Sequence, residues 1–354
     1  MSKLRFIGFA AIFVLCAASA MATNFRAADQ VYVPAVIHAV GSSGTFLSDL
    51  FVSNLTTDSV AVSVIYCPQA QAGGCGGSTS QTFANLLTLA PGERRELIDF
   101  VALPQSQGGL GLTSGFGQIV LNGCKSGTSC GADTQDANGV SQNFRNISVE
   151  SRVYSIPPGT SLSANPPTTG QLFSGYPWYN FVSQEQAANG LDKVFVTGIR
   201  QTGAAGTAGT YRSNIGLVNA SQFSVTTMVV KLFNPTGTQV GSQYSVQLGP
   251  LGSAQVSLGV AFPGASGTGF WVTVEQQNSA ATADAPAACA PPNSNGCPAF
   301  FAYGSVLDNV SGDATTLEPQ YLKALTDAQI ACIYPAPNQA VCKGTPVMRR
   351  VVKK

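Results

Sequence analysis

The chain has 354 residues, a formal net charge of +1 and only 10% charged residues. So neutral a balance gives no reason to expect nucleic acid or another strongly charged polymer as a partner. Solubility must depend on the plentiful Ser, Thr, Asn and Gln, and the 38 glycines and 20 prolines fit an exported β protein of about two domains.

Residues 1–22 have the pattern of a secretory signal peptide. Lys3 and Arg5 precede an apolar stretch at 6–18, and small residues at 18–20 or 20–22 offer a cleavage site. Leu15 before Cys16 is too large for a lipoprotein cleavage motif. The apolar stretch is short for a membrane span, and no later run of about 20 apolar residues follows. We therefore expect export to a periplasmic, cell-surface or extracellular location, without an integral membrane segment.

One stretch of the mature chain occurs twice. Residues 45–66 and 210–231 each contain an aromatic residue and a Ser before a short apolar run, which ends at Asn54 or Asn219. A polar turn and a run rich in β-branched residues follow in both. This pattern predicts strand, turn and strand in each copy.

Further matches keep the same order along the chain. Residues 31–33 match 194–196, the turns at Pro91 and Pro250 match, and the remaining pairs are 115–124 with 269–278 and 148–159 with 302–313. We infer two units, 27–190 and 191–342, followed by a basic tail at 343–354. Each unit contains about seven short strands separated by turns.

This organisation predicts an all-β protein with two tandem antiparallel β-sandwich domains of immunoglobulin-like type. A parallel sheet would need crossover helices, which the sequence lacks. Helix is expected only at 183–188 and 317–330, each after the last strand of its unit. The basic tail is expected to be disordered, with contact to an anionic surface polymer as the alternative.

The motifs together resemble those of a group of exported bacterial proteins. These motifs are VPA at 33–35, the paired hairpins, LAPG at 89–92 and YGSVLDNVSGDATT at 303–316. Their order resembles that of exported bacterial proteins built from tandem immunoglobulin-like β-sandwich repeats. The resemblance implies the fold and an exported setting, and it implies no reaction.

The cysteines of the mature chain fall into four close couples. Eight cysteines allow 105 pairings, but the Gly, Ser and Pro between the members of each couple favour local bridges. A zinc site is not expected because the chain has no CxxC motif and one histidine. The predicted disulfides are Cys67 with Cys75, Cys124 with Cys130, Cys289 with Cys297, and Cys332 with Cys342.

Catalytic patterns are sparse. His38 is the sole histidine, no GxSxG motif surrounds a serine, and we interpret His38 as a strand-end residue near solvent. Asp308, Asp313 and Glu318 form the densest carboxylate group, which would suit calcium or glycoside hydrolysis. Their spacing does not fit an EF-hand, and a turn with Asx hydrogen bonds explains the segment better.

Residues 93–96 place one charge of each sign on each strand face, as a solvated edge would.

One segment carries recognisable binding chemistry. Tyr176, Trp178, Tyr179 and Phe181 lie close together near the junction of the two units. Flat rings with polar tips suit stacking on a sugar or on a protein. The competing interpretation, which we favour, is that they fill the groove between the two sandwiches.

From these patterns we expect a secreted, non-catalytic structural or adhesive protein of a cell surface or matrix, without a cofactor. A surface polysaccharide or a protein is the expected kind of partner. The alternative is a carbohydrate-binding module that uses the aromatic segment, and a less favoured one is an enzyme that uses the loop carboxylates.

Overall fold

The computed structural model describes residues 27–41, 44–68, 75, 80–128, 142–164, 168–183, 192–203, 206–287, 289–291 and 296–321. In these ranges almost all regular structure is antiparallel β-sheet, which confirms the predicted all-β class. The single α-helix of these ranges is α3 (Leu258–Ala261), a short turn of helix. None of the helices in the described ranges has the length and hydropathy that crossing a membrane requires.

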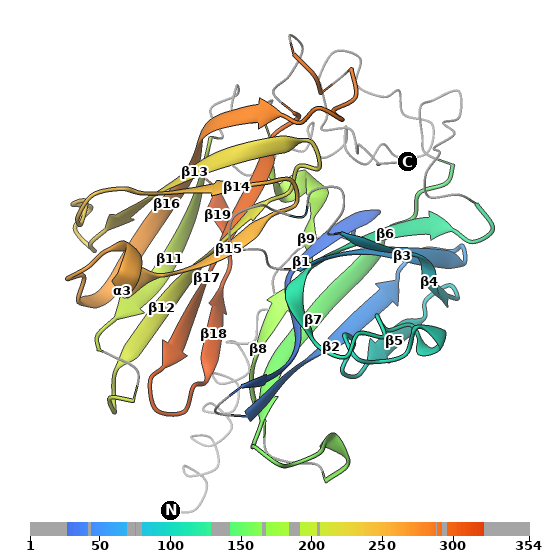
Figure 1. Ribbon diagram of the computed structural model, residues 1–354, viewed down its shortest axis with the longest axis horizontal. Helices are drawn as coiled ribbons and strands as arrows, with labels where there is room; N and C mark the ends of the chain where they lie inside the picture. The colour runs from blue at the N-terminus through green and yellow to red at the C-terminus, as the bar shows by residue number, and fades with distance from the viewer. Residues whose placement is uncertain are drawn as a thin grey trace, which may run out of the picture.

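The first half of the molecule comprises β1 to β9 and lies on the right of Figure 1. One of its two layers has the strand order β4-β3-β6-β1-β9, and the other has β5-β2-β7-β8. The end of β1 also pairs with β2, which joins the layers at one corner. The strands are β1 (Gln30–Gly41), β2 (Gly44–Asn54), β3 (Val60–Pro68), β4 (Gln81–Leu89), β5 (Arg94–Leu97), β6 (Gly115–Lys125), β7 (Ile147–Ile156), β8 (Thr169–Ser174) and β9 (Tyr176–Pro177). The 3-10 helices η1 (Gln105–Gln107) and η2 (Leu162–Ala164) lie in its connections, and η3 (Trp178–Asn180) follows β9.

The second half comprises β10 to β19, on the left of Figure 1. Its layers have the orders β14-β13-β16-β11-β19 and β15-β12-β17, with β18 and β10 also paired to β17. The strands are β10 (Val182–Ser183), β11 (Lys193–Gln201), β12 (Tyr211–Asn219), β13 (Ser224–Phe233), β14 (Tyr244–Leu248), β15 (Ser253–Ser257), β16 (Gly267–Ala281), β17 (Ala299–Asp308), β18 (Ala314–Leu317) and β19 (Gln320–Tyr321).

The two halves pair their strands in the same order. Each of β1 to β9 has a counterpart in the second half whose number is ten higher. Strand β10, which pairs with β17, corresponds to Ala28, which forms an isolated bridge to Ile147 of β7. Strand β10 belongs to the second half's sheet although it precedes residue 191, at which the second unit was predicted to begin.

The two helix predictions need correction where the structure describes their residues. Ser183 lies in β10, Leu317 ends β18, and Gln320 and Tyr321 form β19. Pairing with a neighbouring strand outweighs the weak helical preference of such short segments. Residues 184–191 and 322–330 lie outside the described residues.

A buried asparagine fixes the same turn in each half. Asn54 Nδ2 donates to the carbonyls of Asp58, Leu89 and Ala90, and Asn219 Nδ2 donates to those of Ser224, Leu248 and Gly249. In each half the Asn Oδ1 accepts from the backbone N–H two residues later. Both asparagines are fully buried, so each one satisfies backbone groups that water does not reach.

Each half has its own apolar core between its two layers. In the first half, Val33, Val64 and Leu121 from one layer pack against Leu50 and Val149 from the other. In the second half, residues of β11, β13 and β16 pack in the same way against β12, β15 and β17. A further apolar cluster contains residues of both halves and forms the junction between them.

Candidate functional site

The aromatic segment lies in the junction. Tyr176 belongs to β9, which pairs with β1, and Trp178 and Tyr179 lie in η3. Tyr176, Tyr179 and Phe181 are at most 6% exposed, and Trp178 is half-buried. The indole Nε1 of Trp178 donates to Asp29 Oδ1 at 2.7 Å.

The rings of this segment contact the second half through Phe301 of β17. Tyr176 and Phe181 both stack on Phe301, with centroid distances of 4.6 and 5.0 Å. Phe181 also meets Tyr32 of β1 edge to face at 4.6 Å. The Tyr32 hydroxyl donates to the carbonyl of Ala220 in the second half at 2.9 Å. Tyr176 and Phe181 therefore fill the space between the halves, as the favoured interpretation expects, with Trp178 packed against the same cluster. Tyr179 instead packs into the core of the first half. The buried rings do not present the exposed platform of the alternative.

A half-buried carboxylate lies at one side of the junction. The Tyr176 hydroxyl donates to Glu318 Oε2 at 2.8 Å. Burial raises the pKa of Glu318, and the hydrogen bonds from Tyr176 and Ser174 oppose that rise. Burial, followed by the charge of Glu318, raises the pKa of Tyr176 far above its ordinary value. The Tyr321 hydroxyl is buried without a hydrogen-bond partner in the structure.

The predicted loop carboxylates serve different parts of the structure. Asp308 Oδ1 accepts from the backbone N–H groups of Val310 and Ser311 at 2.9 and 2.8 Å, which is the Asx turn expected from the sequence. These hydrogen bonds lower the pKa of Asp308. Asp313 contributes its backbone carbonyl to this turn, whereas Glu318 faces the junction. Within the described residues, no cluster of three or more His, Cys, Asp or Glu is arranged to hold a metal ion.

The sequence predicted His38 to be a strand-end residue near solvent, but its side chain is mostly buried and contacts an aspartate. Its Nδ1 lies 2.8 Å from Asp99 Oδ1, and both side chains are about four-fifths buried, at 23% and 19% exposed. The backbone N–H of Asp99 donates to Asp49 Oδ1, to which the Tyr154 hydroxyl also donates. Asp99 has a positive φ of 51°, a strained conformation that this hydrogen bonding holds. No sequence pattern indicates this pair, because its members are 61 residues apart.

The charges at 93–96 lie on an outer surface, as predicted. Arg95 pairs with Glu93 at 2.6 Å, and Arg94 pairs with Glu150 of β7 at 3.4 Å. The side chains of Arg94 and Arg95 are 60% and 38% exposed. These pairs contribute little stability, because water and salt screen them.

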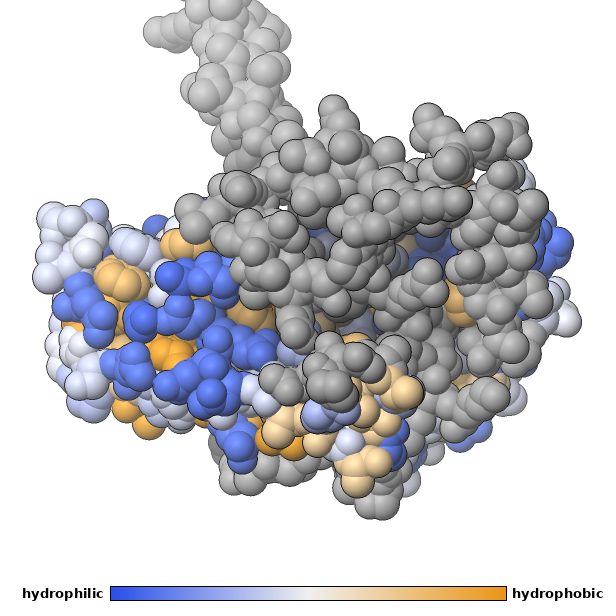
Figure 2. Space-filling view, turned by 90° about the horizontal axis from the view of Figure 1, so that it is seen from above, coloured by the Kyte–Doolittle hydropathy of each residue, from blue (hydrophilic) through white to orange (hydrophobic). Residues whose placement is uncertain are grey.

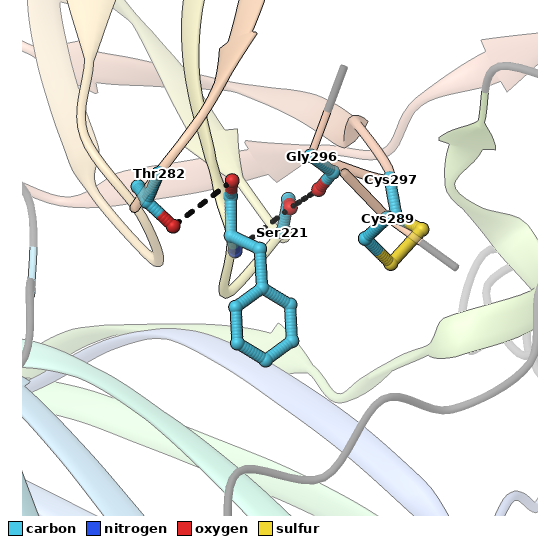
Figure 3. Close-up of a disulfide and its surroundings, with 6 residues drawn as sticks. Ser221, Thr282, Cys289, Gly296 and Cys297 are labelled. Atoms are coloured by element: carbon cyan, nitrogen blue, oxygen red, sulfur yellow. Dashed lines mark hydrogen bonds between the residues drawn. A yellow bond between two sulfur atoms is a disulfide. The ribbon is translucent and has the colours of Figure 1, made fainter. Parts of the chain in front are cut away.

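Two of the predicted disulfides are present. Cys67 pairs with Cys75, and Cys289 pairs with Cys297 across a loop whose Gly296 carbonyl accepts from Ser221 Oγ at 2.7 Å (Figure 3). Cys75 also contacts the second half, because its backbone N–H donates to the carbonyl of Pro250 at 2.8 Å. The other two predicted pairs are not tested, since Cys130, Cys332 and Cys342 lie outside the described residues.

Strand β8 runs beside β18 where the two halves meet (Figure 1). A cavity of about 200 Å³ lies at this place. One wall combines Phe173 of β8 with Tyr303 of β17, whose rings meet edge to face at 5.6 Å. Gly216 makes room for the Tyr303 ring, since a Cβ there would lie 2.0 Å from a ring carbon. Sequence reasoning missed this cavity, because its walls come from strands far apart in the chain.

No protein-family model matches this chain, and no curated protein is similar to it.

Proposed function

We propose that this chain is an exported, non-catalytic structural or adhesive protein of a cell surface or matrix. We further propose that its two halves arose by duplication of one immunoglobulin-like β-sandwich. The shared strand order and the matching hydrogen bonds of Asn54 and Asn219 support the duplication. The paired cysteines support export, since disulfides persist in oxidising compartments.

The observation that carries the proposal is the junction. Phe301 is fully buried beneath rings from the other half, and Tyr32 bonds across the same boundary. Gln118 of β6 adds a hydrogen bond from its Nε2 to the carbonyl of Leu251. Halves joined by a large apolar contact move little relative to each other, whereas small polar contacts allow domain motion. A fixed two-part body with cross-linked loops suits a load-bearing or display role.

The test is the location of the full chain expressed in a bacterial host. We expect the protein outside the cytoplasm, beginning near residue 23, with disulfides 67–75 and 289–297 formed. A variant without residues 1–22 is the matched control and should stay in the cytoplasm. Full-length protein that stays uncleaved in the cytoplasm contradicts the proposal.

The absence of catalysis is tested separately with the purified mature chain. We expect no turnover of glycan, ester or peptide substrates. Turnover that is lost on changing Asp308, Asp313 or Glu318 would instead support the enzyme that uses loop carboxylates.

A further inference from the structure

We infer that the cavity between β8 and β18 is a binding site for a neutral sugar, one ring at the end of a glycan. The inference goes beyond the proposed function and does not depend on where the protein acts. It rests on the size of the cavity and on the chemistry of its walls.

The size of the cavity admits a small ligand. Pockets for drug-sized ligands measure roughly 300–1,000 Å³. At about 200 Å³ this cavity is smaller, so it suits a single ring and not an extended oligosaccharide. Its walls come from both halves, with β7 and β8 on one side and β12, β15, β17 and β18 on the other.

The walls combine aromatic rings with neutral polar groups. Phe46 and Phe116 lie on the same sheet face, because they are paired to Ala39 and Ile37, two residues apart on β1. Both rings are partly exposed, and the polar lining consists of the amides of Gln171, Asn214 and Gln255 with nearby hydroxyls. Apolar ring faces suit the C–H face of a sugar, and amides suit its hydroxyls.

None of the described residues that line the cavity is charged at neutral pH. A charged ligand would lose its hydration there without gaining a counter-charge, which is costly. A neutral polyhydroxylated ligand has no such cost. The lining therefore favours a neutral sugar over a uronic or sialic acid.

Gln171 belongs to the wall that the first half contributes. Its Oε1 accepts from Ser305 Oγ at 3.0 Å, so it links the two sides of the cavity. Its Nε2 is buried, so a ligand does not reach that atom. Hydrogen bonds to a ligand therefore fall to the amides of Asn214, which is half-buried, and Gln255, which is exposed.

The experiment is calorimetric titration of the purified mature chain with D-glucose, D-galactose, D-mannose and N-acetyl-D-glucosamine. D-glucuronate serves as the charged comparison. We expect at least one neutral sugar to bind, with glucuronate bound at least tenfold more weakly. Asn214→Leu, which removes an amide from the lining, should weaken binding at least tenfold.

Two further variants keep the result interpretable. Gln255→Ala changes an exposed residue at the edge of the cavity, cannot disturb the core, and should weaken binding at least threefold. Gln247→Leu changes an exposed amide on β14, away from the cavity, and should leave binding unchanged. No binding of any of the four sugars, equal binding of glucuronate, or full binding by both cavity variants overturns the inference.

Discussion

The same sheet face is buried in one half of the molecule and exposed in the other. In the second half, the outer face of β12, β15 and β17 carries Val218, Phe301 and Tyr303, and it packs against the first half. The strand registers assign Ser53, Ser148 and Glu150 as their counterparts, on an outer face that bears the Arg94–Glu150 pair. The two halves thus share one backbone arrangement but differ in the side chains of this face. The apolar side chains determine that the face of the second half, and not that of the first, is buried in the junction.

The other layer shows the reverse. Tyr32, Ile65 and Val120 of the first half belong to the junction, or pack against it. By strand register their counterparts in the second half are Phe195, Lys231 and Thr273. Lys231 forms an ion pair with Glu275 on that surface. Seen from above, the described part of this half shows mainly hydrophilic residues, with hydrophobic ones scattered among them (Figure 2).

Replacing Phe301 by Ala should give the largest effect. Because the ring is fully buried under Tyr176 and Phe181, its loss should lower the free energy of unfolding by about 3–5 kcal/mol. Chemical denaturation measures this, and small-angle scattering should show a larger radius as the halves loosen. The matched control is Ser148→Ala at the counterpart position, which should change stability by less than about 0.5 kcal/mol. Equal costs at the two positions would show that the faces do not differ as described.

The two buried asparagines should respond alike. Asn54→Ala and Asn219→Ala each remove a buried donor that three backbone carbonyls share, so each should cost about 2–3 kcal/mol. Hydrogen exchange should rise around the turn of the altered half and not around the other. Costs that differ by more than about 1.5 kcal/mol would mean that the two turns are alike in geometry only.

The junction should also respond to pH through Glu318. Burial raises the folded-state pKa of Glu318 above its ordinary value of 4.5, so the folded state binds a proton more readily than the unfolded chain. The stabilisation that protonated Glu318 contributes is therefore complete below about pH 4.5. It is lost as the pH rises through the raised folded-state pKa. Glu318→Gln keeps an acceptor for Tyr176 and should raise the melting temperature at pH 7. The gain should vanish below pH 4, and a gain independent of pH contradicts this account.

The smallest effect is expected on the exposed face. Arg94 is 60% exposed in its ion pair with Glu150, so Arg94→Ala should change the free energy of unfolding by less than about 1 kcal/mol. High salt should remove most of that difference. Denaturation at low and high salt measures it, and a loss above about 2 kcal/mol would mean that this surface is not simply solvated.

Local patterns predicted the strands well, whereas contacts between distant segments were out of reach. The hairpins around Asn54 and Asn219 follow from alternation and turn residues, which act over a few positions. If Gly115 is matched with Gly269 in the sequence, the counterpart of Leu121 in the second half is Glu275. The strand registers give Val274 as the counterpart instead, because Leu121 pairs with Val31 and Val274 pairs with Val194, the residue that matches Val31. A one-residue slip exchanges the two faces of a strand, and bulges in the strands produce such slips.

The candidate sites depended even more on distant contacts. The aromatic segment could be recognised from its composition, but Phe301, its partner ring, lies 120 residues or more further along the chain. The pairing of His38 with Asp99 and the walls of the cavity likewise join segments that only the fold brings together. Sequence periodicity tells which residues are buried in a sheet, and it does not tell which outer face meets another sheet.

The junction joins two unlike faces, which makes it a head-to-tail contact. Such a contact leaves one uncovered face at each end of the molecule. A third copy of the unit could therefore add at either end, and repeated addition would form a fibre. The two free faces are the ones that carry Arg94–Glu150 and Lys231–Glu275. Burying these charges would be costly. The charged residues that distinguish the two outer faces from the buried ones therefore also disfavour the addition of a third unit.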